Sequence, residues 1–164
     1  MFSPENALYH KFLAPHLCEN FILQSRIHKL NTFGENVFVK RDDELSSGIT
    51  GSKYRKFASL IPFLVKENFD EVLLIGSAQS NNITGLLQLF REENINPKLM
   101  LLQSNETDLK GNLLWMSLLY NMVDVIWITR SDWKNVNELA ADYQHQHTDK
   151  KIFIVNEGAA NAEA

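Results

Sequence analysis

The sequence EVLLIGSAQSNNITG, residues 71–85, contains a predicted strand, a polar loop and the start of a helix. The strand is the apolar run at residues 71–76, which ends in glycine and is typical of a strand buried on both faces. The loop covers residues 77–82, and a helix is expected over residues 83–93. A buried strand that leads into a helix in this way predicts one βαβ unit of a parallel sheet.

The same alternation repeats towards the C-terminus. Further strands are predicted at residues 97–102, 123–128 and 151–155. A helix is expected at residues 111–120, and Asp132 is expected to cap another. Strands that alternate with helices at this spacing indicate parallel strands joined by right-handed crossovers. We therefore expect an α/β fold, with an open parallel sheet of four or five strands and flanking helices.

The fifth strand would come from the segment VFVKRDDELSSGITGSKYRKF, residues 37–57. This segment predicts a strand at residues 37–40, a polar loop, and a helix that opens at Ser52 and Lys53. Ser52 is a suitable N-cap because its hydroxyl can accept a hydrogen bond from a free backbone N–H of the first turn. Lys53 then lies at the positive end of the helix dipole, which favours the neutral amine of a nucleophilic lysine. The alternative is a solvated lysine on an exposed helix face.

Composition excludes several classes of function. Of the 164 residues, 45% are apolar and 22% are charged, which is typical of a globular protein. Sixteen basic and 20 acidic side chains give a net charge of −4, so we expect no nucleic-acid surface. The single cysteine, Cys18, excludes an internal disulfide framework and fits a reducing compartment. No apolar run approaches the roughly 20 residues of a membrane span and no secretory signal is visible, so we expect a cytoplasmic protein without membrane contact.

Two further patterns favour ordinary structural roles. His145 and His147 form an HxH pair without a nearby cluster of carboxylates or cysteines, so no metal site is expected. The apolar residues of the helix at residues 111–120 are expected to lie in the core rather than to form a cofactor-binding surface. They are Trp115, Met116, Leu118 and Leu119.

Two polar loops leave the carboxyl ends of predicted strands, at residues 41–51 and 76–82. Ligands of open α/β sheets bind beyond these strand ends. The second loop runs into a helix N-terminus, where free N–H groups and small polar side chains can hold an anion or a carboxylate. The alternative is that Ser80 or Asn81 only caps the helix. Neither loop matches a P-loop or a GxGxxG fingerprint, so an ordinary nucleotide site is not expected.

Four segments in succession carry a resemblance to one family. They are VKRDDELSSGITGSKYRKF, LLIGSAQSNNITG, TDLKGNLLWMSLLYNMVDVIWI and IFIVNEGAANAEA. Their order and spacing over residues 37–164 resemble the 1-aminocyclopropane-1-carboxylate deaminase and D-cysteine desulfhydrase family of fold-type II pyridoxal-phosphate enzymes. The KRDD…G.K.RK and GxxQSNN elements are the most specific blocks. The resemblance implies pyridoxal phosphate as cofactor and the fold of the family's small domain.

The resemblance also implies a role for each polar residue in these blocks. Lys53 would form the covalent link to pyridoxal phosphate and later move protons at the substrate carbon. Asn81 would donate a hydrogen bond to the phenolic oxygen of the cofactor. Ser80, expected to be catalytic with Lys53, would line the substrate-carboxylate side together with Gln79, and Asn82 would help to shape it. The substrate would be a small amino acid, D-cysteine or 1-aminocyclopropane-1-carboxylate, converted to a 2-keto acid and ammonia, with sulfide as well when the substrate is D-cysteine.

Two features differ from the family pattern. The family usually has Gly-Gly-Asn-Lys where this chain has Thr50-Gly51-Ser52-Lys53, and members of the family are much longer. We therefore expect residues 1–36 to be an arm that belongs to an otherwise missing large domain. Residues 37–164 would form the α/β domain that carries the lysine, ending before the rest of the large domain. The loop that binds the cofactor phosphate is expected in that missing part.

Three functions remain open at this point. The first is a pyridoxal-phosphate lyase or deaminase, incomplete as this chain alone, that is either a fragment of a longer enzyme or one half of a two-chain enzyme. Its partner would be a complementing C-terminal half or, in a homo-oligomer, a second copy. The second is a non-catalytic remnant or interaction module of the same family, with an exposed apolar patch where the large domain should dock. The third is an unrelated α/β module that binds a small ligand without covalent lysine chemistry.

Overall fold

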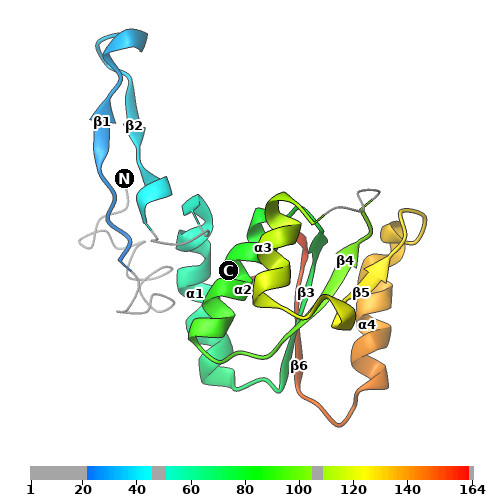
Figure 1. The fold of residues 1–164 in the computed structure, drawn as a ribbon. Coiled ribbons are helices and arrows are strands. Elements are labelled where there is room, and N and C mark those ends of the chain that lie inside the picture. The colour runs from blue at the N-terminus through cyan, green and yellow to red at the C-terminus, as the bar shows by residue number, and fades with distance from the viewer. Residues whose placement is uncertain (1–21, 46–50, 105–108, 163–164) are drawn as a thin grey trace.

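A sheet of four parallel strands forms the centre of the protein (Figure 1). The structure, a computed structural model, describes residues 22–45, 51–104 and 109–162, without the side chain of Ser52. The strand order is β5-β4-β3-β6. The strands are β3 (Glu71–Ser77), β4 (Pro97–Leu102), β5 (Ile126–Ile128) and β6 (Ile152–Val155). The predicted α/β fold is confirmed, with four strands in the parallel sheet.

Four helices cover the two faces of this sheet. They are α1 (Tyr54–Glu67), α2 (Asn81–Glu92), α3 (Gly111–Leu119) and α4 (Val136–Gln146). Helices α1, α2 and α3 lie on one face and α4 lies on the other (Figure 1). The chain moves outward from β3 to β4 and β5, and then returns through α4 to β6 on the other side of β3. Because crossovers between parallel strands are right-handed, this reversal places α4 on the opposite face.

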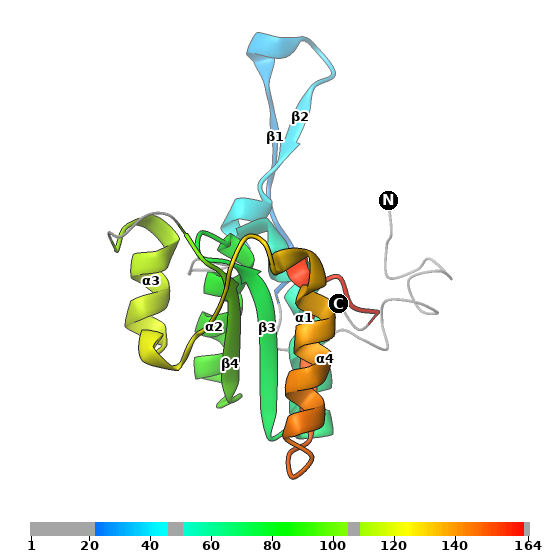
Figure 2. The same ribbon diagram turned by 90° about the vertical axis from the view of Figure 1, so that its right-hand side faces the viewer.

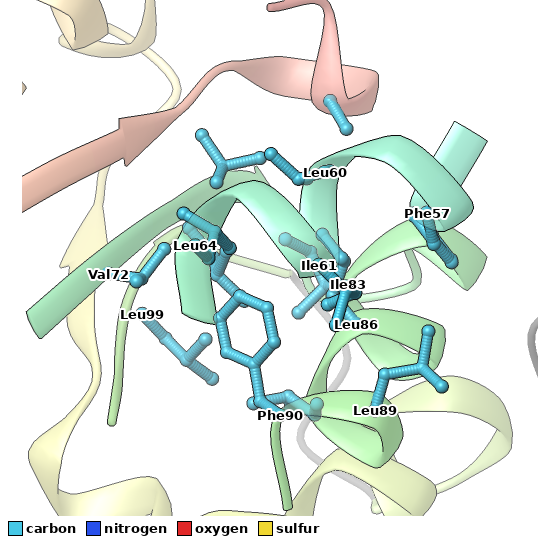
Figure 3. Close-up of a cluster of buried hydrophobic side chains, with 14 of the residues drawn as sticks. Phe57, Leu60, Ile61, Leu64, Val72, Ile83, Leu86, Leu89, Phe90 and Leu99 are labelled. Carbon is cyan, nitrogen blue, oxygen red and sulfur yellow. The ribbon is translucent and has the colours of Figure 1, made fainter. Parts of the chain in front are cut away.

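Strand β3 is the centre of the core because both of its faces are covered. Val72 and Leu74 belong to the cluster under α1 and α2, whereas Leu73 and Ile75 belong to the cluster under α4. All four side chains are buried, and their alternation follows the two-residue period of a strand. Figure 3 shows the larger cluster, in which side chains of α1 and α2 meet. Each such side chain contributes about 1.5–3 kcal/mol through burial.

The strand expected at residues 37–40 forms, but it does not join the parallel sheet. It is β2 (Phe38–Lys40), which pairs antiparallel with β1 (Ile27–Lys29) in a separate two-stranded sheet. Of the four or five parallel strands that were expected, the sheet therefore has four. A parallel neighbour needs a long crossover connection, whereas a short turn allows antiparallel pairing, and here the 3-10 helix Asn31–Phe33 and Gly34 provide the turn.

The β1–β2 hairpin projects away from the α/β body in both views (Figures 1 and 2). It spans the expected domain boundary between residues 36 and 37. The division of the chain into an arm and an α/β domain stays a prediction, and residues 1–21 of the arm lie outside the described residues.

Several helix ends differ from the expected ones. Helix α1 begins at Tyr54, after the 3-10 turn Gly51–Lys53, and its N-cap residue is Lys53, without a side-chain capping bond. Ser52 is therefore not the N-cap, and any bond of its hydroxyl lies outside the described residues. The 3-10 turn adds one tight turn before the α-helix, which moves the cap by one residue. Asp132 likewise precedes a 3-10 turn and makes no capping bond.

Helix α3 buries less of its apolar surface than the sequence suggested. Met116 is fully buried, whereas Trp115 is 51% and Leu118 is 62% exposed. The expectation that both of the latter lie in the core was wrong. A helix that is apolar on all sides does not show in its periodicity which stripe faces the sheet, and α3 packs through one stripe only. Within the described part of the chain, no helix is long and apolar enough to cross a membrane.

The carboxylate of Asp42 connects the base of the hairpin to α1 through hydrogen bonds. Asp42 accepts two hydrogen bonds from the Arg55 guanidinium, at 2.7 and 2.9 Å, and one from the Ser25 hydroxyl, at 2.6 Å. These bonds, with the guanidinium as the largest cause, hold the pKa of Asp42 well below its ordinary value of 3.8. Asp42 therefore connects the hairpin to the first turn of α1, next to Lys53.

We predict that Asp42→Asn loosens this connection. Amide exchange at Leu30, whose N–H donates to Val37, should show the free energy of hairpin opening falling by about 1–2 kcal/mol, the usual range for partly exposed charge-assisted bonds. Because the folded pKa of Asp42 is depressed, its contribution is complete above pH 4 or so and is lost as the pH falls further. In Asp42→Asn, the free energy of hairpin opening should therefore not show this decrease as the pH is lowered.

The matched control is Asp43→Asn, which removes the exposed, local pair of Asp43 with Arg41. This pair is local and does not reach α1, so the control should change hairpin opening much less than Asp42→Asn does. Equal effects of the two variants would contradict the role assigned to Asp42.

Candidate functional site

The candidate site lies at the carboxyl edge of the parallel sheet. The strand order reverses at β3, next to β6, and such a reversal creates a crevice beyond the strand ends. Helix α1 ends shortly before β3 begins and runs antiparallel to it, so the N-terminus of α1 also lies at this edge. A direct contact supports this placement, since Lys56 Nζ donates to the Gly158 carbonyl beyond β6, at 2.8 Å.

The junction of β3 and α2 leaves almost no free space. A Cβ atom on Gly76 would lie 2.8 Å from Cγ1 of Ile83, so only glycine lets the first turn of α2 approach the strand end this closely. Ser80 is the N-cap, and its Oγ accepts from the Ile83 N–H at 3.3 Å. The capping alternative is therefore realised for Ser80. Its hydroxyl hydrogen can still be donated, because a serine hydroxyl both donates and accepts.

Asn81 and Asn82 belong to the first turn of α2 rather than to a loop, but they differ in exposure. Asn81 is exposed, and its Oδ1 accepts a hydrogen bond from Asn112 Nδ2 at 2.6 Å. Asn82 is only 3% exposed, and among the residues that the structure describes neither its Nδ2 nor its Oδ1 has a hydrogen-bond partner. A buried polar group without a partner costs about 1–3 kcal/mol, so an asparagine at this position is unfavourable for stability unless a further group pairs with it.

Sequence reasoning did not single out Asn112, the second residue of α3. Its Nδ2 also donates to the Gln79 backbone carbonyl, at 2.8 Å. Gly111 precedes it with φ of 56°, and a Cβ there would lie 3.1 Å from Gln79 Oε1. The start of α3 thus packs tightly against the loop after β3. The sequence block TDLKGN includes Asn112, but nothing in the local sequence indicates which loop this asparagine contacts.

Lys53 lies at the N-terminus of α1 with an exposed side chain. Lys56, one turn further, is half-buried, and burial followed by the nearby Lys53 charge lowers its pKa. Gly51 has φ of 52°, a left-handed conformation that glycine adopts readily. This backbone conformation favours glycine at position 51, two residues before Lys53, where the family pattern also has glycine. Thr50, which differs from the pattern, lies outside the described residues.

A cavity of about 280 Å³ opens at the carboxyl ends of β3, β4 and β5. It is lined by Ser77, Ala78, Gln79, Leu102, Gln103, Ser104 and Arg130. Arg130 is the charged member of this lining, and the other polar members offer hydroxyl and amide groups. Sequence reasoning missed Arg130, although its position just beyond a strand end was a usable signal.

The described residues contain no group of three or more side chains that could hold a metal ion. Of the HxH pair, His147 lies beyond the end of α4, and its Nδ1 is hydrogen-bonded to the Tyr143 carbonyl at 2.8 Å.

Comparison with known proteins gives relatives of one kind. A putative 1-aminocyclopropane-1-carboxylate deaminase of Thermotoga maritima is 27% identical over 132 residues, which cover 79% of this chain and 41% of that protein. The mitochondrial bifunctional D-cysteine desulfhydrase/1-aminocyclopropane-1-carboxylate deaminase of Arabidopsis thaliana is 26% identical over 153 residues, covering 85% of this chain and 38% of that protein. No family model matches the chain.

The fold comparison agrees. A crystal structure of a 1-aminocyclopropane-1-carboxylate deaminase homologue superposes with a TM-score of 0.69 at 22% identity, over 96% of this chain and 48% of the other. The predicted resemblance is confirmed, which argues against an unrelated ligand-binding module. The chain spans about two fifths of the length of the curated relatives it matches.

We predict that Gly76→Ala destabilises the protein by about 1–3 kcal/mol, because the added methyl overpacks the contact with Ile83. Urea denaturation measures the change in the free energy of unfolding. In an Ile83→Ala background the opposing Cγ1 atom is absent, so the same substitution should cost much less. A cost that is equal in the two backgrounds would show that close approach is not the reason for glycine at this position.

Proposed function

We propose, because the chain is related to the 1-aminocyclopropane-1-carboxylate deaminase and D-cysteine desulfhydrase family, that its carboxyl edge is part of a pyridoxal-phosphate site. The enzyme would be a deaminase or lyase acting on a small amino acid. The main support is that the two most specific sequence blocks, far apart along the chain, both begin helices at this edge. One contains Lys53 at the start of α1, and the other contains residues 79–82 at the start of α2.

The residues present fit such a cofactor. Lys53 offers an exposed primary amine, which a carbonyl group requires for covalent attachment. Asn81 is exposed and has its oxygen engaged by Asn112, so its NH₂ group remains as a donor for an acceptor oxygen. The free N–H groups and positive dipole of the α2 N-terminus favour a carboxylate nearby. Lys56 is the less suitable amine because Gly158 holds its Nζ.

Each residue would have a separate task. Bound pyridoxal phosphate supplies an electron sink for the bonds of the substrate α-carbon. Lys53 would bind the cofactor covalently and move a proton at that carbon, and Asn81 would donate to the phenolic oxygen. The Ser80 hydroxyl and Gln79 would orient the substrate carboxylate, and Asn82 would shape the site from below. D-cysteine or 1-aminocyclopropane-1-carboxylate, the compounds in the names of the relatives, would be converted to a 2-keto acid and ammonia, and D-cysteine would release its sulfur as sulfide as well.

The rest of the catalytic unit would come from polypeptide beyond these elements, such as a complementing C-terminal half, and a homo-oligomer is the other expected assembly. The exposed apolar side chains of α3 are the expected contact surface. They are Leu114, Trp115 and Leu118. The same surface is the specific observation that favours the alternative function, a non-catalytic interaction module of this family, because a contiguous exposed apolar surface indicates a binding partner.

We predict that pyridoxal phosphate, added to the purified chain and fixed with borohydride, leaves its pyridoxyl group mainly on Lys53. Peptide mass spectrometry identifies the modified lysines. Lys53→Gln should abolish most of the labelling. Lys56→Gln is the matched control, since Lys56 is the neighbouring amine with a lowered pKa, and it should leave labelling of Lys53 intact.

Labelling that is spread over many lysines, and is the same in Lys53→Gln, would contradict the proposed site. It would favour the interaction module instead.

A further inference from the structure

We infer that Asn112 is a positioning residue, which fixes the side-chain amide of Asn81 so that its NH₂ group faces outward as a hydrogen-bond donor. The inference rests on the proposed function for the identity of the acceptor that this donor meets. The orientation itself follows from contacts among residues of this chain alone.

A backbone carbonyl determines which end of the Asn112 side-chain amide takes part in these hydrogen bonds. The Gln79 carbonyl can only accept, so Asn112 must present its Nδ2 to it, at 2.8 Å. The same Nδ2 lies 2.6 Å from the side chain of Asn81. Because an NH₂ group only donates, Asn81 must turn its Oδ1 towards Asn112. A flipped Asn81 amide would place two donors opposite each other and lose this bond.

The position of Asn112 is fixed by the backbone around it. It lies in the first turn of α3, directly after Gly111, which has a left-handed φ and packs close to the Gln79 side chain. The amide of Asn112 is half-buried, and both of its hydrogens are directed at acceptors of the β3–α2 connection. Two elements that are far apart in sequence therefore determine one amide orientation.

An outward NH₂ group selects the chemistry of its ligand. It stabilises an oxygen that carries negative charge and cannot accept from a hydroxyl group. Towards bound pyridoxal phosphate, it would favour the ionised phenolic oxygen over the protonated one. Asn112 would thereby lower the phenolic pKa of the bound cofactor without touching the cofactor.

Two variants separate this role from simple structural support. Asn112→Asp keeps the size of the side chain but can only accept, so it should turn the Asn81 amide around, with its oxygen outward. Asn112→Ala removes the contact without imposing an orientation. A carboxylate in the first turn of α3 is favourable to the helix dipole, so Asn112→Asp should be at least as stable as Asn112→Ala to urea.

The first measurement needs no cofactor. Side-chain amide signals in ¹⁵N NMR spectra of the chain report hydrogen exchange of the Asn81 NH₂ group, with Asn81→Ala used for assignment. In the wild type this group should exchange rapidly with water. In Asn112→Asp it should donate to the carboxylate and exchange several-fold more slowly. Equal exchange in the two proteins would overturn the inference whether or not the proposed function is correct.

The second measurement uses the chain loaded with pyridoxal phosphate. Absorption spectra as a function of pH give the phenolic pKa of the bound cofactor. This pKa should rise in the order wild type, Asn112→Ala, Asn112→Asp, and cofactor retention should fall about tenfold in Asn112→Asp, as expected for the loss of one bond to a charged group. If the phenolic pKa and cofactor retention instead change in parallel with stability to urea, so that Asn112→Ala shows the larger changes, the positioning role would be overturned.

The two measurements distinguish the possible failures. A wild-type chain that shows the expected exchange pattern but binds no cofactor would support the amide orientation and contradict the proposed function. A chain that binds cofactor with the same phenolic pKa in all three proteins would support the proposed function and overturn the inference.

Discussion

The first turn of α2 rests directly on the end of β3, and the rest of the candidate site depends on this close approach. Gly76 permits it because any side chain there would overlap Ile83. Ser80 then caps the helix, and Asn81 and Asn82 follow in its first turn, one exposed and one buried. The same edge is reached by α1, because α1 runs antiparallel to β3, and by α3, through Asn112. The tight junction of β3 and α2 thus positions the start of α2, against which the start of α3 packs.

The polar side chains at this edge differ in whether hydrogen bonds fix their positions. Lys53 is exposed. Lys56 donates a hydrogen bond to the Gly158 carbonyl, and Asn112 donates to two acceptors. Side chains that are held determine the shape of the edge, and side chains that are free remain available to a ligand. This division is what a site for a covalently attached cofactor requires, since geometry has to be fixed before the ligand arrives.

Much of the fold could be predicted because its signals are local. The apolar run of β3, bounded by Gly76, indicates a buried strand from composition alone, and the alternation with helices indicates a parallel sheet. The pairing of β2 could not be predicted in this way, because a three-residue strand has the same pattern in a hairpin and in a sheet. The exposed stripe of α3 was missed for a related reason, since an apolar helix does not reveal which side faces the sheet. Asn112 was missed because its contacts with Gln79 and Asn81 join residues about thirty positions apart.

The central claim is that the starts of α1 and α2 form one binding surface. The most direct test is a titration of the ¹⁵N-labelled chain with pyridoxal phosphate, followed by the backbone amide signals in NMR spectra. The account predicts that the largest shifts occur together at the N-terminus of α1, in the connection from β3 to α2 and at the start of α3. Shifts centred on α4 or on the hairpin, or shifts at the start of α1 without any at α2, would contradict it.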